Sequence, residues 1–196
     1  MLKKLREKCA FTLVELIVVL VILAILAALL VPALTGYIDK SRKSQVIAET
    51  RALHEAIQTE MVELYASSAW QSNSTLVTVA SATGSEDQKE KYHAITSLSE
   101  VPSLVSGNGR FLGVVNRNGQ VHCILYDNGK GYLGLYFNET QEYMAIKASE
   151  APDTNTYFET YANCVIVTNI VDPKNDPQYS PWTRDNFLLF IGYTHH

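Results

Sequence analysis

An uninterrupted apolar run near the N-terminus constrains the fold of this chain more than any other feature. From Phe11 to Leu34 the only charged residue is Glu15. A helix rises about 1.5 Å per residue, so this run spans about 36 Å, whereas the hydrocarbon core of a bilayer is about 30 Å thick. A lone segment in lipid must satisfy its own backbone hydrogen bonds, which only a helix can do. We therefore predict a membrane-spanning helix over 11–34.

The residues before this run predict its orientation. Residues 1–10 carry four basic side chains and one acid, so the positive-inside rule leaves the N-terminus in the cytoplasm and sends the rest outward. A cleaved secretory signal peptide is an alternative, but its apolar core usually has about 7 to 15 residues and ends in a small-x-small cleavage site. A lipoprotein anchor at Cys9 is another, but no apolar segment precedes Cys9.

A charged residue at position 15 is energetically unfavourable in a membrane-spanning helix. A charged side chain deep in a bilayer costs a few kcal/mol, and such groups usually have a specific partner. We therefore expect Glu15 to have a functional partner rather than to be a solvated surface acid.

The basic leader, the string AFTLVE at 10–15 and the apolar helix interrupted by Pro32 together resemble the class III signal of type IV pilins and pseudopilins. The resemblance implies that a membrane aspartic peptidase, the prepilin peptidase, cuts between Ala10 and Phe11 and methylates the new amine. Glu15 is then the fifth residue of the mature chain. The family usually has glycine where this chain has Ala10, which is also small. This similarity covers only about the first 25 residues.

The same resemblance implies assembly into a fibre, with an assembly ATPase and a membrane platform protein as partners. In a bundle of subunits, the Glu15 carboxylate can pair with the Phe11 ammonium of a neighbour. Desolvation offsets much of the attraction between buried charges, so we expect this pair to set register more than stability. Pro32 lacks an N–H and should kink or locally open the helix.

An amphipathic helix is predicted to continue the apolar one over 35–66. Val46, Leu53, Ile57, Met61 and Leu64 recur at helical spacing and predict one buried face. The charged residues on the other faces indicate solvated surface or subunit contacts.

The remaining residues, 67–196, predict one compact β-rich head. We expect a strand at 76–80 and a helix from about 86 to 100, which Ser85 and Gln88 begin with capping-box spacing. Asn118-Gly119 and Asn128-Gly129 punctuate four runs that predict an antiparallel meander at 110–116, 120–127, 132–137 and 142–147. A further strand at 163–171, a Pro- and Asp-rich surface loop at 172–186 and an apolar run at 187–193 follow. The predicted fold class is α+β and pilin-like, with the long helix packed on an antiparallel sheet.

Charge and cysteines restrict the partners of the head. The net charge is −4, and loss of the leader lowers the side-chain charge by three to −7, which argues against direct nucleic-acid binding. Cys123 and Cys164 lie on two predicted strands and form a candidate disulfide outside the cytosol. Since each also lies in an apolar run, two buried free thiols are an equal alternative.

Candidate sites for metal or catalysis are few. His122-Cys123 gives poor ligand geometry and no CxxC pair is present, so no metal site is expected there. Asp172, Asn175, Asp176 and Asp185 form a less favoured calcium candidate, since their spacing does not match an EF-hand. The five histidines accompany no hydrolase or phosphate-binding motif, so we expect no cofactor and no enzymatic activity.

The sequence therefore predicts a type IV pilin that polymerises through its N-terminal helix into an extracellular filament for motility, adhesion or surface attachment. Its precursor would be a single-pass protein of the inner membrane. The alternatives are a pseudopilin of a type II secretion or competence system, and an uncleaved membrane-anchored extracellular hydrolase or receptor.

Overall fold

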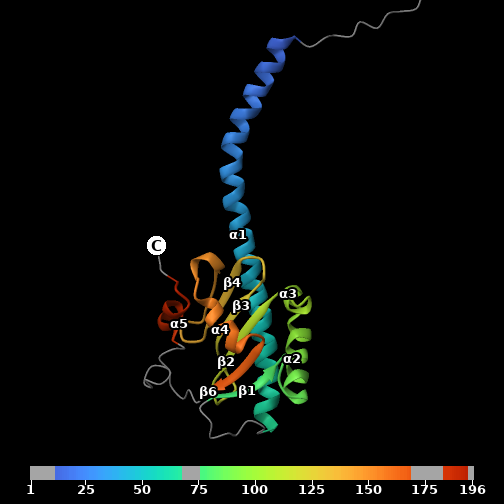
Figure 1. Ribbon diagram of the computed structural model, residues 1–196, viewed down its shortest axis with the longest axis vertical. Helices are drawn as coiled ribbons and strands as arrows, with labels where there is room; N and C mark the ends of the chain where they lie inside the picture. The colour runs from blue at the N-terminus through green and yellow to red at the C-terminus, as the bar shows by residue number, and fades with distance from the viewer. Residues whose placement is uncertain (1–11, 68–75, 169–182, 194–196) are drawn as a thin grey trace, which may run out of the picture. The chain divides into compact units, whose positions relative to one another are not determined.

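The computed structural model describes residues 12–67, 76–168 and 183–193 (Figure 1). The chain divides into two compact units between Ser41 and Arg42, and each is described by itself. Helix α1, Leu13–Ser67, contributes to both units. Its end agrees with the predicted end near residue 66.

The part of α1 in the second unit buries the predicted apolar face. The five residues predicted from their spacing are each at most 7% exposed. Ala56 and Thr50 lie on the same face and are also buried. This confirms that the predicted apolar face of the long helix is one wall of a globular core.

A six-stranded sheet forms the centre of the head, in the order β1-β6-β2-β3-β4-β5. The strands β2 to β5 form the predicted antiparallel meander. The predicted antiparallel sheet is confirmed for these strands, and the structure adds one parallel pairing, of β6 with β2, before β1 closes that edge antiparallel. The sheet is therefore mixed but mostly antiparallel. The strands are β1 Leu76–Ser81, β2 Arg110–Val115, β3 Val121–Asp127, β4 Tyr132–Phe137, β5 Glu142–Lys147 and β6 Cys164–Thr168.

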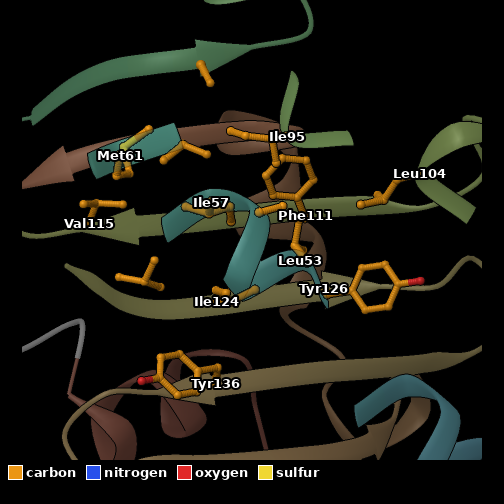
Figure 2. Packing of buried hydrophobic residues seen from close by; sticks show 14 of the residues in the cluster. Leu53, Ile57, Met61, Ile95, Leu104, Phe111, Val115, Ile124, Tyr126 and Tyr136 are labelled. Atoms are coloured by element: carbon orange, nitrogen blue, oxygen red, sulfur yellow. The ribbon is translucent and has the colours of Figure 1, made fainter. Parts of the chain in front are cut away.

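Successive side chains of a strand point to opposite faces of the sheet. The central strands carry apolar side chains at nearly every position, so both faces of the sheet are buried. One face packs against α1, α2 (Glu86–Ser99) and α3 (Pro102–Val105), as Figure 2 shows around Ile57 and Phe111. The other face packs against α4 (Thr154–Tyr161) and α5 (Arg184–Phe190), with Phe158 and Phe187 in its core. A short 3₁₀ helix, η1 (Ala148–Glu150), precedes α4.

Local capping begins α2 as predicted. The Ser85 side chain accepts a hydrogen bond from the Gln88 N–H, and Gln88 Oε1 accepts one from the Ser85 N–H at 2.9 Å. The Gln88 amide also donates to the Thr78 carbonyl of β1 at 2.8 Å. One capping residue therefore fixes both the start of α2 and its position against the edge strand.

Gln58 of α1 holds the β2–β3 hairpin. Its side-chain nitrogen donates to the Gly119 carbonyl at 2.7 Å, and its Oε1 accepts from the Val121 N–H at 3.1 Å. The pairing of β2 with β3 shifts between Val114 and Val115, which leaves the Val121 N–H to this side chain. Two backbone groups of the turn are therefore satisfied by one residue of the helix.

Gln58→Ala is expected to destabilise the head by about 2 kcal/mol, because a buried backbone N–H left without an acceptor costs about 1–3 kcal/mol. The measurement is urea unfolding of the full chain in mild detergent, followed by near-ultraviolet circular dichroism. Gln45→Ala is the control: the exposed Gln45 hydrogen-bonds only the Glu49 side chain of its own helix, so its loss should cost at most about 0.5 kcal/mol. Equal effects of the two variants would contradict the hairpin role of Gln58.

Candidate assembly segment and processing motif

The first part of α1 presents an apolar surface on every side. Its large side chains from Leu13 to Leu34 are all about half exposed or more, between 48% and 75%. Among the described residues α1 is the helix long and apolar enough to cross a membrane. Exposed apolar surface of this extent requires lipid or other protein around it. The segment thus has the surface of a membrane span or of a helix within a bundle.

Glu15 closes the N-terminal turn of α1. Its carboxylate accepts hydrogen bonds from the Thr12 N–H at 2.9 Å and the Thr12 hydroxyl at 2.7 Å, while Thr12 Oγ1 accepts one from the Glu15 N–H at 3.3 Å. This reciprocal arrangement is a capping box. This cap was not predicted from the sequence, although a threonine followed three residues later by a glutamate is its signal.

The capping box gives Glu15 neutral partners and leaves its charge uncompensated. Within the described residues no ion pair with Glu15 is recorded. Capping also directs the carboxylate toward the N-terminal end of the helix. Ala10 and Phe11 themselves lie outside the described residues.

Pro32 lies within α1, and the helix continues on both sides of it. Proline has no N–H, so the carbonyl four residues earlier, that of Ala28, receives no hydrogen bond from position 32. The Thr35 hydroxyl donates to the Pro32 carbonyl at 2.9 Å. Opening of the helix at Pro32 in an assembled fibre stays a prediction.

The candidate disulfide is not formed, because Cys123 and Cys164 are both free and buried. Strand β2 lies between their strands: Cys123 pairs with Val114, and Cys164 pairs with Leu112. Two strand spacings of about 4.8 Å separate them, more than the roughly 7 Å that a disulfide can span between Cα atoms. The thiols are instead small members of the apolar core, and burial raises the pKa of Cys123 far above its usual value.

The calcium candidate falls mostly outside the described residues, which include only Asp185 of its four members. Asp185 accepts a hydrogen bond from Arg184 Nη1 at 3.0 Å. Within the described ranges no group of three or more acidic, histidine or cysteine side chains is close enough to hold a metal ion.

The described histidines differ in their environments. His122 is buried on β3, and His93 is exposed on α2. His54 of α1 lies against the Tyr136 ring, with the ring centroids 4.1 Å apart, and its Nδ1 is hydrogen-bonded to the Tyr143 hydroxyl at 2.5 Å. Burial lowers the pKa of His54, and the nearby Glu55 carboxylate partly opposes this shift.

Because the pKa of His54 is lowered in the folded chain, we expect acid to reduce the free energy of unfolding of the head. As pH falls through about 6.5, the unfolded chain binds a proton at His54 before the folded chain does, so the free energy of unfolding declines until the folded pKa is reached. Above the unfolded pKa His54 contributes no pH dependence. His54→Gln should remove this part of the decline between pH 7.5 and 5.5 in urea unfolding, whereas His93→Gln should retain it. An unchanged pH profile in His54→Gln would contradict the prediction.

Comparison with known proteins supports the reading of the N-terminus. Residues 5–31 match the family model described as the prokaryotic N-terminal methylation motif. No curated protein and no solved structure matches the chain significantly. The match covers the second half of the basic leader, Glu15 and most of the apolar segment, and none of the head.

The chain thus carries the N-terminal methylation motif, or class III signal, of the type IV pilin and pseudopilin family. Its fold is the corresponding pilin-like α+β arrangement, with a long, N-terminally apolar helix and a six-stranded sheet. Proteins of this kind are typically non-enzymatic. The motif implies processing by the prepilin peptidase, a membrane-bound precursor, pilus-like assembly and a location at the surface or in a secretion apparatus.

Proposed function

We propose that the protein is a pilin, the repeating subunit of a type IV pilus used for motility, adhesion or surface attachment. Cleavage between Ala10 and Phe11 leaves the apolar segment 11–34 as the filament core, while 35–66 continues the helix and 67–196 forms the outward head. The prepilin peptidase, an assembly ATPase and a membrane platform protein act on it.

One observation carries this proposal. The processing motif is continuous with an apolar helical segment whose side chains are exposed within the described residues of its own unit. The same helix continues into the second unit, where its apolar face is part of the core of the head. A helix with apolar side chains on every side is stable only in lipid or among other helices. The first environment suits the precursor and the second the assembled fibre. The Glu15 carboxylate, capped by neutral donors of Thr12, supplies the charged group by which neighbouring helices recognise their register.

The catalytic alternative receives no specific support. The head has a continuous apolar core on both faces of its sheet. The titratable groups with shifted pKa values within it, such as those of His54 and Tyr136, are explained by burial and packing. We propose that the protein is structural and acts without a cofactor.

Imaging of the cell surface tests the proposal. Filaments sheared from cells are labelled with antibody to the head and examined in negative stain. Long labelled filaments are expected. Short stubs confined to the envelope would instead assign the chain to a pseudopilin system, and labelled protein that never enters a filament would favour the membrane-anchored hydrolase or receptor.

A further inference from the structure

A polar cleft of about 510 Å³ lies within the second unit, between its part of α1, the start of α3 and the turn that joins β3 to β4. Pockets of about 300–1,000 Å³ with a few convergent polar groups are the usual sites for small ligands. Apolar surface comes from Pro102 and Tyr132. The polar side chains that line the cleft include those of Arg42, Gln45, Glu49, Ser103, Asn128 and Lys130.

Asn128 contributes a side-chain amide whose orientation is fixed by its own turn. Its Oδ1 accepts hydrogen bonds from the Lys130 N–H at 2.8 Å and the Tyr132 N–H at 3.2 Å. The residue is only 8% exposed, yet within residues 12–67, 76–168 and 183–193 its NH₂ group donates to no acceptor. Buried side-chain donors in native proteins nearly always have an acceptor. The amide therefore has a donor available to a ligand in the cleft.

The β2–β3 hairpin contains the same turn with the corresponding donor satisfied. Asn116 Oδ1 accepts hydrogen bonds from the Asn118 N–H at 2.9 Å and the Gln120 N–H at 3.0 Å, two and four residues later, as in the Asn128 turn. Its Nδ2 then donates to Gln120 Oε1 at 3.2 Å. In the Asn128 turn the corresponding position is Tyr132, which has no side-chain carbonyl. The available donor is thus a property of the turn at the cleft, not of this turn type.

Two cations share the cleft with this amide, Lys130 from the same turn and Arg42 from α1. Both residues are exposed, and within the described ranges neither forms an ion pair or lies over an aromatic ring. Ammonium, guanidinium and amide NH₂ groups are donors and not acceptors. This part of the cleft is therefore suited to an anion such as a carboxylate.

The cleft also contains one carboxylate held in a fixed position, that of Glu49. It accepts hydrogen bonds from the Gln45 amide at 2.8 Å and from the Tyr126 hydroxyl at 2.9 Å. Figure 2 shows the Tyr126 hydroxyl, in red, pointing away from the buried cluster. Since the Tyr126 proton is directed to Glu49, the Ser103 hydroxyl, 2.5 Å away, must donate to the Tyr126 oxygen. A carboxylate has about four lone-pair sites, so Glu49 can still accept hydrogen bonds from ligand hydroxyls.

We propose that this cleft binds an acidic disaccharide unit of a polysaccharide, made of one uronic acid and one neutral hexose. Arg42, Lys130 and the Asn128 NH₂ group hold the sugar carboxylate, and Glu49 accepts hydrogen bonds from hydroxyls of the second ring. Glu49 is seven residues, or about 10 Å of helix, from Arg42, so a ligand that reaches both is longer than one sugar ring.

The charge of the cleft favours this ligand over a zwitterion. Two cations and one carboxylate leave a net charge of +1. A ligand with a single carboxylate neutralises this charge, whereas a zwitterionic peptide leaves it uncompensated. In the proposed pilus, such a site would attach the filament to an acidic polysaccharide. Only this use of the site, not the binding itself, rests on the proposed function.

Isothermal titration calorimetry of the full chain in mild detergent tests the site with soluble probes. Cellobiouronate, a glucuronic acid joined to glucose, should bind at least about tenfold more tightly than cellobiose, because a hydrogen bond to a charged group is worth about a factor of ten or more. Cellobiose differs only by a CH₂OH group in place of the carboxylate. Acetate, which lacks the hydroxyls for Glu49, and diglycine, which is zwitterionic, should also bind more weakly than cellobiouronate.

Asn128→Asp is the most specific variant, because it keeps the oxygen that accepts from the turn and replaces the NH₂ donor by a second acceptor. It should weaken cellobiouronate binding at least about tenfold. Asn116→Asp is the matched control, since it makes the same change in the same turn away from the cleft, and should leave binding unchanged. Lys130→Gln and Glu49→Ala should each weaken cellobiouronate binding.

Four results would overturn the proposal: no binding of cellobiouronate, equal binding of cellobiose, acetate or diglycine that binds as tightly as cellobiouronate, or normal binding by Asn128→Asp. Near-ultraviolet circular dichroism checks the fold of each variant. Where Asn128→Asp does not fold, normal binding by Lys130→Gln contradicts the site instead. The unassembled chain suffices for this titration, so a lack of binding contradicts the saccharide site, whereas a lack of filaments on cells contradicts only the proposed function.

Discussion

Replacing Glu15 with glutamine is expected to lower the yield of surface filaments at least tenfold while membrane insertion and the fold of the head stay intact. Glutamine can still accept the hydrogen bonds of the capping box, so the start of the helix should be preserved. Only the negative charge is lost. Removing one partner of a buried ion pair leaves the other charged and unpaired, at a cost of about 3–5 kcal/mol per contact.

Thr12→Ala is the matched control for this experiment. It removes the hydroxyl of the capping box and keeps the carboxylate, so it should reduce filament yield far less than Glu15→Gln. The readout is the amount of chain in the sheared surface fraction relative to the chain in membranes. A normal yield for Glu15→Gln together with a low yield for Thr12→Ala would show that Glu15 acts as a cap, not as a charge.

The second large effect is expected at Gly134, where β4 passes close to α1. A Cβ at Gly134 would collide with Thr50 Oγ1 and lie 3.0 Å from Val46 Cγ1 and 3.2 Å from Tyr126 Cδ1. Thr50 is fully buried, so it has no free space to move into. Overpacking of this kind costs about 1–3 kcal/mol, and we expect Gly134→Ala to lie at the upper end of that range.

A partner substitution shows whether this collision is the cause. The Thr50 hydroxyl donates only to the Val46 carbonyl of its own helix, at 2.7 Å, so Thr50→Ala should cost little. The double variant Gly134→Ala, Thr50→Ala should be at least about 1 kcal/mol more stable than the sum of the single effects predicts. Gly113→Ala is the control, since its Cβ would meet nothing closer than the Ile57 side chain at 3.0 Å, whereas a Cβ at Gly134 would overlap Thr50 Oγ1, so Gly113→Ala should cost less. Additive effects at Gly134 and Thr50 would contradict the close approach.

The sequence predicted the helix and the meander well because both depend on local patterns. The buried face of α1 was predicted from apolar residues that recur with a period near 3.6 residues. The hairpins were predicted from turn sequences such as Asn118-Gly119, where Gly119 has φ 78°. The capping residues of α2 were identified for the same reason. These elements need no knowledge of distant contacts.

The elements that were missed depend on distant partners. The parallel pairing of β6 with β2 joins Ile166 to Val114, 52 residues apart, and no local signal specifies its direction. The apolar run at 187–193 alternates too little to distinguish a strand from a helix. Packing of Phe187 against Phe137 and Tyr157, on the sheet face away from α1, accompanies its helical form. The sequence predicted only one covered face.

The candidate site also combines features that local sequence patterns predict with features that depend on distant contacts. Glu15 was found from the cost of a charge in an apolar run, whereas its Thr12 partner was overlooked. A polar cleft of the second unit, lined by Glu49, Ser103 and Lys130, could not be predicted, because these residues come together only when α1, α3 and the β3–β4 turn pack.

The mass of the mature chain is the most direct measurement of whether this protein is processed and assembled as proposed. Intact mass spectrometry of filaments sheared from cells should show a chain that begins at Phe11, with one methyl group on its amine and the first ten residues absent. A filament or membrane fraction in which the chain still begins at Met1, in cells with an active prepilin peptidase, would contradict processing. The free ammonium that Glu15 is proposed to bind would then not exist.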